Sequence, residues 1–251
     1  KIKDLPIEIT TLADIPSEGS GLGSSSSVTV GLLNALYAYK GIQVTSEKLA
    51  KDACEIEIDI LKKPIGKQDQ YAAAFGSLNR IIFNKDGTVS INKLPISNSS
   101  LRVFGSNLLL FYTGLTRKSS SILSDQKKKF SINRYNMDEI VKLVPEFEKI
   151  FFKDDNFIKA GELLNQNWEL KKKLSNKISN EFIEKMYSIA MSQGAVGGKI
   201  SGAGGGGFLL LYVPRENQNK VRKALSKYRE FPFMLETDGS KIIFNIKSEY
   251  W

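Results

Sequence analysis

The sequence predicts an α+β fold in which helices pack on one face of an antiparallel sheet. Strand-like and helix-like patterns alternate along the 251 residues, two glycine-rich runs interrupt them, and we find no internal repeat. At about 150 residues per domain, this length fits one large or two small domains. Hydrophobic residues make up 41% of the chain and charged residues 25%, as in ordinary globular proteins with a core.

The first half mixes strands and helices. An alternating stretch runs into a loop rich in glycine and serine over 16–27, and an apolar helical pattern follows directly. Thr45 and Ser46 are both plausible N-caps for the next helix, and Pro64 closes it. An Asp-Gly pair at 86–87 predicts a hairpin turn. The expected elements are a strand over 5–15, helices over 28–39, 46–61 and 71–75, and hairpin strands over 78–83 and 88–96.

The second half begins after Ser97-Asn98-Ser99-Ser100, which resembles a linker and places a domain boundary near residues 97–106. We therefore expect an N-terminal domain over 1–100 and a C-terminal domain over 101–251. The elements expected in the second are strands over 108–112, 208–213, 231–236 and 241–246, and helices over 119–129, 136–151, 157–174, 180–193 and 216–228.

The composition excludes several classes of enzyme. The chain has no histidine, which removes Ser-His-Asp and Cys-His nucleophile pairs and every histidine-ligated metal site. The one cysteine, Cys54, can form neither an internal disulfide nor a cysteine cluster, and we interpret it as a core residue. No apolar run approaches the roughly 18 residues of a membrane span, and no signal peptide is evident. We expect a cytoplasmic protein without a membrane partner.

The net charge of +9 favours anionic partners such as nucleotides, phosphorylated metabolites or nucleic acid. Nucleic acid has weak support, because the lysines are dispersed and no motif interleaves aromatic and basic residues. The lysine runs at 127–129 and 171–173 are interpreted as solvated helix faces. We therefore expect small-molecule partners and no nucleic acid.

The loop over 16–27 has the features of a phosphate site. Its glycines allow close approach of backbone N–H groups, its serines add hydroxyls, and the next helix contributes the positive end of its dipole. A flexible connector is the alternative, but a spacer does not fit tightly between a strand and an apolar helix. The loop is not a Walker P-loop, because no Gly-Lys-Ser or Gly-Lys-Thr follows the glycines.

A second glycine-rich run covers residues 199–207 and contains five glycines among six residues, more than a tight turn requires. It formally satisfies the G-x-G-x-x-G pattern, but it leaves a helix and opens a strand, the reverse of a dinucleotide-binding loop. Carboxylates follow the second predicted helix at Glu55, Glu57, Asp59 and Asp69. Phosphoryl transfer needs a carboxylate and a hydroxyl on Mg²⁺ and a carboxylate near the acceptor oxygen.

Taken together, these segments resemble the GHMP kinases. Residues 16–26 look like the second motif of that family, residues 199–207 look like its third, and Glu57 with 64–70 resembles its magnesium and catalytic segment. The four-serine loop, residues 112–117, and Trp168 with the lysines after it look most like the heptose 7-phosphate kinases. The resemblance implies an N-terminal ribosomal-protein-like domain, here truncated, and a C-terminal ferredoxin-like domain.

The activity implied is ATP-dependent phosphorylation of the anomeric hydroxyl of D-glycero-D-manno-heptose 7-phosphate, for nucleotide-activated heptose and surface polysaccharide. By analogy Asp69 is the base, and Glu57 and Ser25 are Mg²⁺ ligands. The residues implied at the nucleotide phosphates are Pro16, Gly19, Ser20, Gly21, Leu22, Gly23, Ser24, Ser25 and Ser26. The residues implied at the acceptor, besides Asp69, are Gly202, Ala203, Gly204 and Gly205, in a segment that braces the first loop.

Two cations are our own additions to the implied site. Lys67, two residues before Asp69, is expected to keep that carboxylate ionised and to attract the transferred phosphate. Arg117 is a candidate for the acceptor's 7-phosphate, since a guanidinium fork suits phosphate, and a surface role is the alternative. Another GHMP kinase, such as an L-fucose or galactose kinase, remains an alternative function, as does a non-catalytic sensor.

The front of the chain departs from the family pattern. The family's first motif is not present, and the chain opens at Lys1 inside an alternating stretch. We therefore expect that an N-terminal portion carrying part of the acceptor site precedes Lys1. The sequence leaves the oligomeric state open, a homodimer included.

Overall fold

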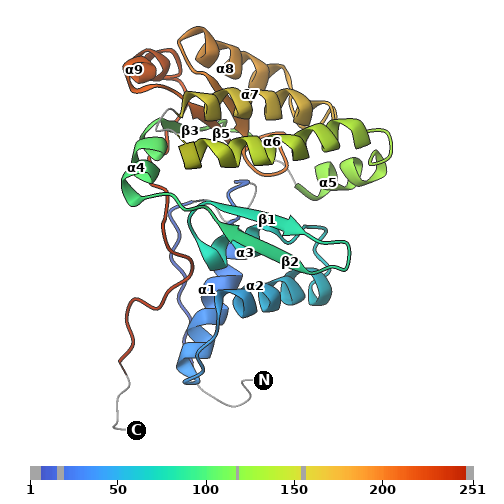
Figure 1. Cartoon of the computed structure of the whole chain (residues 1–251), viewed down its shortest axis with the longest axis vertical. Coiled ribbons are helices and arrows are strands. Elements are labelled where there is room, and N and C mark those ends of the chain that lie inside the picture. Colours follow the sequence, from blue (N-terminus) through green and yellow to red (C-terminus); the bar gives the residue numbers. More distant parts are fainter. Residues whose placement is uncertain (1–6, 16–19, 117–118, 154–156, 247–251) are drawn as a thin grey trace.

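The computed structural model describes residues 7–15, 20–116, 119–153 and 157–246, which form two lobes joined side by side (Figure 1). The first lobe contains helices α1, α2 and α3 and a two-stranded hairpin. The second contains a three-stranded sheet with its helices. The last part of the chain returns from the second lobe and runs along the first.

In the first lobe, three helices pack against one another and against the hairpin (Figure 1). Their core is a cluster of apolar side chains that includes the buried Cys54. The hairpin is antiparallel and pairs Asn79 with Lys93 and Phe83 with Val89 around the predicted Asp-Gly turn. The elements are α1 (Ser24–Tyr39), α2 (Ser46–Cys54), α3 (Gln68–Phe75), β1 (Asn79–Phe83) and β2 (Val89–Lys93).

Helix α2 begins where its cap predicts, because the Thr45 hydroxyl accepts a hydrogen bond from the backbone N–H of Lys48 at 3.2 Å. After Cys54 the helix widens into a π-helical turn, η1 (Glu55–Ile60). Such turns are rare and occur frequently at functional sites. The turn replaces the last part of the single helix predicted over 46–61, and it carries the buried Glu57.

In the second lobe, the strands β3 (Leu108–Tyr112), β5 (Phe208–Tyr212) and β4 (Gly197–Ile200) form an antiparallel sheet in the order β3-β5-β4. Leu109 and Phe111 enter one hydrophobic cluster, whereas Leu108 enters another. Both faces are therefore covered by helices, and the expectation of a single covered face is wrong. The helices are α4 (Asn98–Ser106), α5 (Ser119–Lys128), α6 (Arg134–Lys153), α7 (Ile158–Lys172), α8 (Glu181–Ser192) and α9 (Arg215–Ala224).

Several predicted elements differ from the structure. The described residues 7–15 form no strand, and most are exposed. The strands predicted over 231–236 and 241–246 are also absent, because this segment makes only an isolated bridge, between Glu230 and Phe111. Strand β4 was not predicted, since its two glycines disfavour strand structure.

The linker predicted at Ser97 to Ser100 is the start of α4. The Ser97 hydroxyl accepts a hydrogen bond from the backbone N–H of Ser100 at 3.0 Å and caps the helix. Serines favour helix caps for the same reason that they favour loops, because their hydroxyls bond to nearby backbone groups. The run of serines therefore marks a helix start.

Candidate active site

The serine-rich loop leads directly into the N-terminus of α1. Gly23 caps the helix in the left-handed conformation, with a φ of 72°, and its carbonyl accepts from the backbone N–H of Ser27 at 2.9 Å. The Ser20 and Ser24 hydroxyls lie 3.1 Å apart across the loop. This arrangement places serine hydroxyls and the positive end of a helix dipole on one surface, which suits an anion.

The carboxylate of Glu57 is fully buried and accepts four hydrogen bonds. Its Oε1 accepts from Ser25 Oγ at 2.7 Å and from Lys63 Nζ at 2.9 Å. Its Oε2 accepts from Ser26 Oγ and from Gln70 Nε2, both at 2.6 Å. Burial alone raises the pKa of Glu57, but the four donors together outweigh burial and hold that pKa below its usual value. Glu57 is therefore an ionised carboxylate at the first turn of α1.

Lys63 places a cation between the two predicted magnesium ligands. Its Nζ lies 2.6 Å from Ser25 Oγ and 2.9 Å from Glu57 Oε1, so the ammonium group contacts both oxygens. No group of three or more acidic, cysteine or histidine side chains suited to a metal occurs among the described residues. One carboxylate and one hydroxyl fit Mg²⁺ bound together with substrate phosphates, the usual arrangement for this ion.

Asp69 lies beside the loop, in the first turn of α3. A Cβ atom added to Gly23 would lie 3.4 Å from Asp69 Cγ, so the carboxylate packs directly against the loop backbone. Partial burial of the carboxylate and the negative charge of Glu57 raise the pKa of Asp69. A carboxylate with a raised pKa accepts a proton more readily, as a general base requires.

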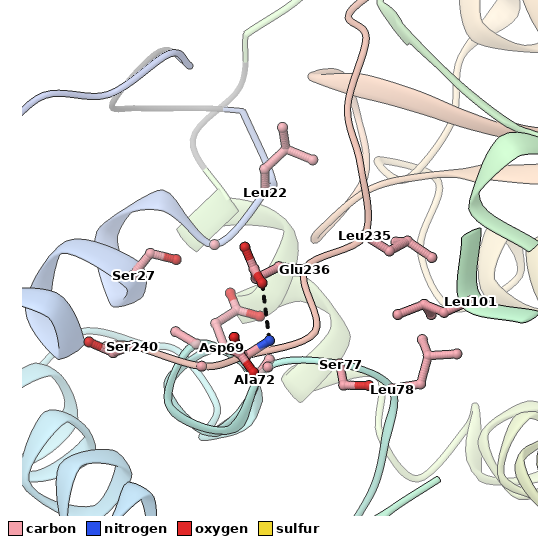
Figure 2. A pocket seen from close by; sticks show the side chains of 15 residues that line it. Leu22, Ser27, Asp69, Ala72, Ser77, Leu78, Leu101, Leu235, Glu236 and Ser240 are labelled. Carbon is pink, nitrogen blue, oxygen red and sulfur yellow. Dashed lines mark hydrogen bonds between the residues drawn. The ribbon is translucent and has the colours of Figure 1, made fainter. Parts of the chain in front are cut away.

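A pocket of about 620 Å³ opens beside Asp69, and the other side of it comes from the last part of the chain (Figure 2). Leu22 and Gly23 of the loop line it, together with Glu236 and Ser240. This volume is in the range of small-molecule sites. The acidic residues that line the pocket are thus Asp69 from α3 and Glu236 and Asp238 from the returning segment.

The returning segment is tied to the first lobe by backbone contacts. The backbone N–H of Ser77 donates to the Glu236 carbonyl, and that of Ser240 donates to the Ala73 carbonyl, both at 3.0 Å. A Cβ atom on Gly239 would lie 2.0 Å from the Ala74 carbonyl oxygen, so only glycine allows this approach. These contacts explain why the segment does not pair as a hairpin.

The two glycine-rich loops touch each other. A Cβ atom on Gly21 would lie 2.7 Å from the Ser201 carbonyl oxygen, and one on Gly202 would lie 2.7 Å from Gly21 Cα. The second loop therefore supports the first across the boundary between the lobes. Gly204 and Gly206 face their own lobe instead and would clash with Ile178 and Leu115 if they carried side chains.

We expect Gly21→Ala to destabilise the fold by about 1–3 kcal/mol, because the new methyl group meets Ser201 and the backbone is left-handed, with a φ of 71°. Urea unfolding measures this change. Gly31→Ala is the matched control, because nothing lies within 4 Å of its added methyl group inside α1. Ala stabilises a helix relative to Gly by up to about 1 kcal/mol. Equal effects of the two substitutions would contradict the loop contact.

One predicted role is wrong. The ammonium group of Lys67 donates to the Gly87 carbonyl at 2.7 Å, in the hairpin turn, and it does not contribute to the pKa of Asp69. That pKa is raised rather than lowered. Three other predicted residues, Pro16, Gly19 and Arg117, lie outside the described residues.

Sequence reasoning missed three residues of the site. Lys63 and Gln70 bind Glu57, and Glu236 lines the pocket from more than 160 positions beyond Asp69. Gln70 follows Asp69 directly, and its position just before the apolar stretch 71–75 of α3 is a signal that it is buried. Nothing in the sequence marks Glu236.

Comparison with known proteins decides the family. The model for GHMP kinases N terminal domain matches residues 1–77, and the model for GHMP kinases C terminal matches residues 143–230. Over 248 residues the chain is 34% identical to a protein of Campylobacter jejuni named D-glycero-alpha-D-manno-heptose 7-phosphate kinase. The matched region covers 95% of this chain and 71% of that protein. The chain belongs to the GHMP kinases. Its family is one of phosphotransferases, and its α+β fold is theirs.

Two solved structures support the same assignment. One, described as a D-glycero-D-manno-heptose 1-phosphate kinase from Bacteriodes thetaiotaomicron, has a TM-score of 0.67 and 26% identity over 90% of this GHMP kinase chain. The other, a putative sugar kinase from Campylobacter jejuni, has a TM-score of 0.69 and 30% identity over 90% of it. The chain spans 64% and 65% of those two chains. Among the helices that the structure describes, none has the length and apolar composition to span a bilayer.

Proposed function

We propose that this GHMP kinase transfers the γ-phosphate of ATP to the anomeric hydroxyl of D-glycero-D-manno-heptose 7-phosphate and forms the 1,7-bisphosphate. The observation that carries the proposal is the placement of Asp69 against the loop that leads to Ser25, whose hydroxyl donates to Glu57. A base and a cation site thus meet at one helix N-terminus. The 34% identity to a kinase named for this sugar supports the acceptor.

The described loop residues Ser20 to Ser26 bind the nucleotide phosphates through backbone N–H groups and hydroxyls. Ser25 and Glu57 are the residues that would hold Mg²⁺, and Lys63 contacts both of them when no metal is bound. When bound, Mg²⁺ neutralises charge that develops on the transferred phosphate. Ser26 and Gln70 hold the second oxygen of Glu57 and so fix the orientation of that carboxylate.

Asp69 accepts the proton of the sugar hydroxyl as the hydroxyl oxygen attacks the γ-phosphorus and the bond to the β-phosphate oxygen breaks. The acceptor occupies the pocket beside Asp69, which Glu236 also lines. Oε1 of Glu236 accepts from the backbone N–H groups of Thr237 and Asp238, so its other oxygen is the one that accepts from a sugar hydroxyl. The contact of Gly202 with Gly21 keeps the second loop at the border of this site. A cytoplasmic location follows from the use of ATP and a sugar phosphate.

The acceptor is tested by measuring ADP release with Mg-ATP by the full-length protein. The panel is D-glycero-D-manno-heptose 7-phosphate, the unphosphorylated heptose, mannose, L-fucose and galactose. We expect turnover with the phosphorylated heptose alone. Turnover with fucose or galactose instead would assign the chain to the neutral-sugar kinases, which are also among its relatives at 27% identity.

A further inference from the structure

Lys171, at the end of α7, and Lys199, in β4, are two lysines without a carboxylate partner among the residues that the structure describes. The Nζ of Lys171 donates to the Gly202 carbonyl at 2.5 Å. Within the described ranges, neither Lys171 nor Lys199 forms an ion pair, and no carboxylate contributes to the pKa of either. Lys172, the next residue along, is by contrast paired with Glu169 at 2.8 Å and Glu184 at 2.9 Å. The run 171–173 was expected to be a solvated face, but only Lys173 is exposed, whereas Lys171 and Lys172 are half-buried.

The fold places the two lysines on packed elements, α7 and β4, close enough for the charge of Lys199 to act on Lys171. Gly197 and Lys199 share a face of β4, because side chains alternate along a strand. A Cβ atom on Gly197 would lie 2.0 Å from the Gly161 carbonyl oxygen, so this face packs against α7. Burial and the charge of Lys199 lower the pKa of Lys171 to about 7, and burial also lowers the pKa of Lys199.

Further polar atoms on the same turn of α7 have no partner. Trp168 is fully buried, and its indole Nε1 makes no hydrogen bond. The side-chain oxygen of Asn167 is likewise buried without a partner. These residues lie three and four positions before Lys171, on the neighbouring surface of the helix. Buried polar groups in proteins are normally satisfied, so this cluster has the features of a site that is completed by a ligand.

The cluster adjoins the proposed active site. Lys171 holds the carbonyl of Gly202, the residue that contacts Gly21 in the phosphate loop. Gly23, two residues along that loop, packs against Asp69. The contact between Gly21 and Gly202 therefore separates the two groups. Lys171 and Lys199 lie on the side of the second lobe, and Asp69 lies on the side of the first.

We propose that Lys171 and Lys199 bind a phosphate monoester on the acceptor, the phosphate that the acceptor carries before the reaction. This assignment rests on the proposed function and names the residues that recognise the phosphate of its acceptor. A phosphate dianion supplies the counter-charge that both ammonium groups lack, and hydrogen bonds between ions are the strongest available to it.

Calorimetric titration of the full-length protein tests the proposal. The ligands are heptose 7-phosphate, unphosphorylated heptose, inorganic phosphate and Mg-ADP, and the variants are Lys171→Met and Lys199→Met. Lys173→Met is the matched control, because Lys173 is exposed at the end of the same helix. We expect each of the two variants to lower the affinity for heptose 7-phosphate at least tenfold. Their affinities for heptose and Mg-ADP should change less than twofold, and the control should leave all of these affinities unchanged.

Unchanged affinity for heptose 7-phosphate would overturn the proposal. An equal loss of affinity for Mg-ADP would also overturn the proposal, and it would assign the lysines to the nucleotide phosphates. Because Met removes charges rather than bulk, we expect both variants to fold, and Lys171→Arg, which keeps the charge, is a second variant if one does not. If heptose 7-phosphate is not a substrate but inorganic phosphate still binds in a manner that depends on both lysines, the phosphate site stands and only the proposed acceptor fails.

Discussion

Asp69→Asn is expected to lower kcat for phosphoryl transfer by about two to four orders of magnitude, the usual contribution of a general base. The amide keeps the shape of the side chain beside Gly23 but cannot take the hydroxyl proton. The nucleotide does not contact this group in the proposed arrangement, so the affinity for Mg-ADP should stay within a factor of two. Steady-state kinetics and nucleotide titration together measure the two effects.

The pH dependence of the unsubstituted enzyme provides a second check on Asp69. Because burial and the charge of Glu57 raise the pKa of Asp69, activity should fall on acidification at a pH above the usual range for aspartate. Asp59→Asn is the control, since that carboxylate is exposed on η1. A variant of Asp69 that retains full turnover would show that the carboxylate is not the base.

Glu57→Gln is expected to cost about 2–4 kcal/mol of unfolding free energy at neutral pH, because the amide N–H₂ group meets donors where the carboxylate accepted four hydrogen bonds. The pKa of Glu57 is lowered in the folded protein, so its stabilisation is complete above the pKa of an unfolded glutamate. It is lost as the pH falls through the lower, folded value. The difference between the two proteins should therefore shrink in acid.

Urea unfolding in chelator-containing buffer at neutral and acidic pH measures this difference. Repeating it with Mg-ADP tests the metal role, because the nucleotide complex should stabilise the unsubstituted protein far more than the variant. Glu55→Gln is the matched control, since Glu55 is exposed on the same π-helical turn. Equal stabilisation of both proteins by Mg-ADP would remove Glu57 from the magnesium site.

Local signals predicted much of the fold. The Thr45 cap, the Asp-Gly turn at 86–87 and the apolar run over 108–112 each depend on a few neighbouring residues, and the structure confirms all three. The two glycine-rich loops were recognised in the same way. Their contact through Gly21 and Gly202 is a fact of the structure, whereas their roles in binding remain proposals.

Features that depend on distant residues could not be predicted in this way. The π-helical turn is set by packing of Glu57 against α1, and the absence of strands over 231–246 is set by docking of that segment on the first lobe. Lys171 lies in a run of three lysines that has the composition of a solvated surface. Only the tertiary structure separates the half-buried Lys171, which donates to the Gly202 carbonyl, from the exposed Lys173.

The central claim is that the protein moves a phosphate from ATP to the anomeric oxygen of a sugar that already carries one. Phosphorus NMR of a reaction of the full-length protein with Mg-ATP and D-glycero-D-manno-heptose 7-phosphate tests it most directly. The account predicts ADP and a product with two phosphomonoester signals, one coupled to the anomeric proton, and formation of both at least a hundredfold more slowly with Asp69→Asn. Release of inorganic phosphate alone, or a second phosphate on any other oxygen, would contradict it.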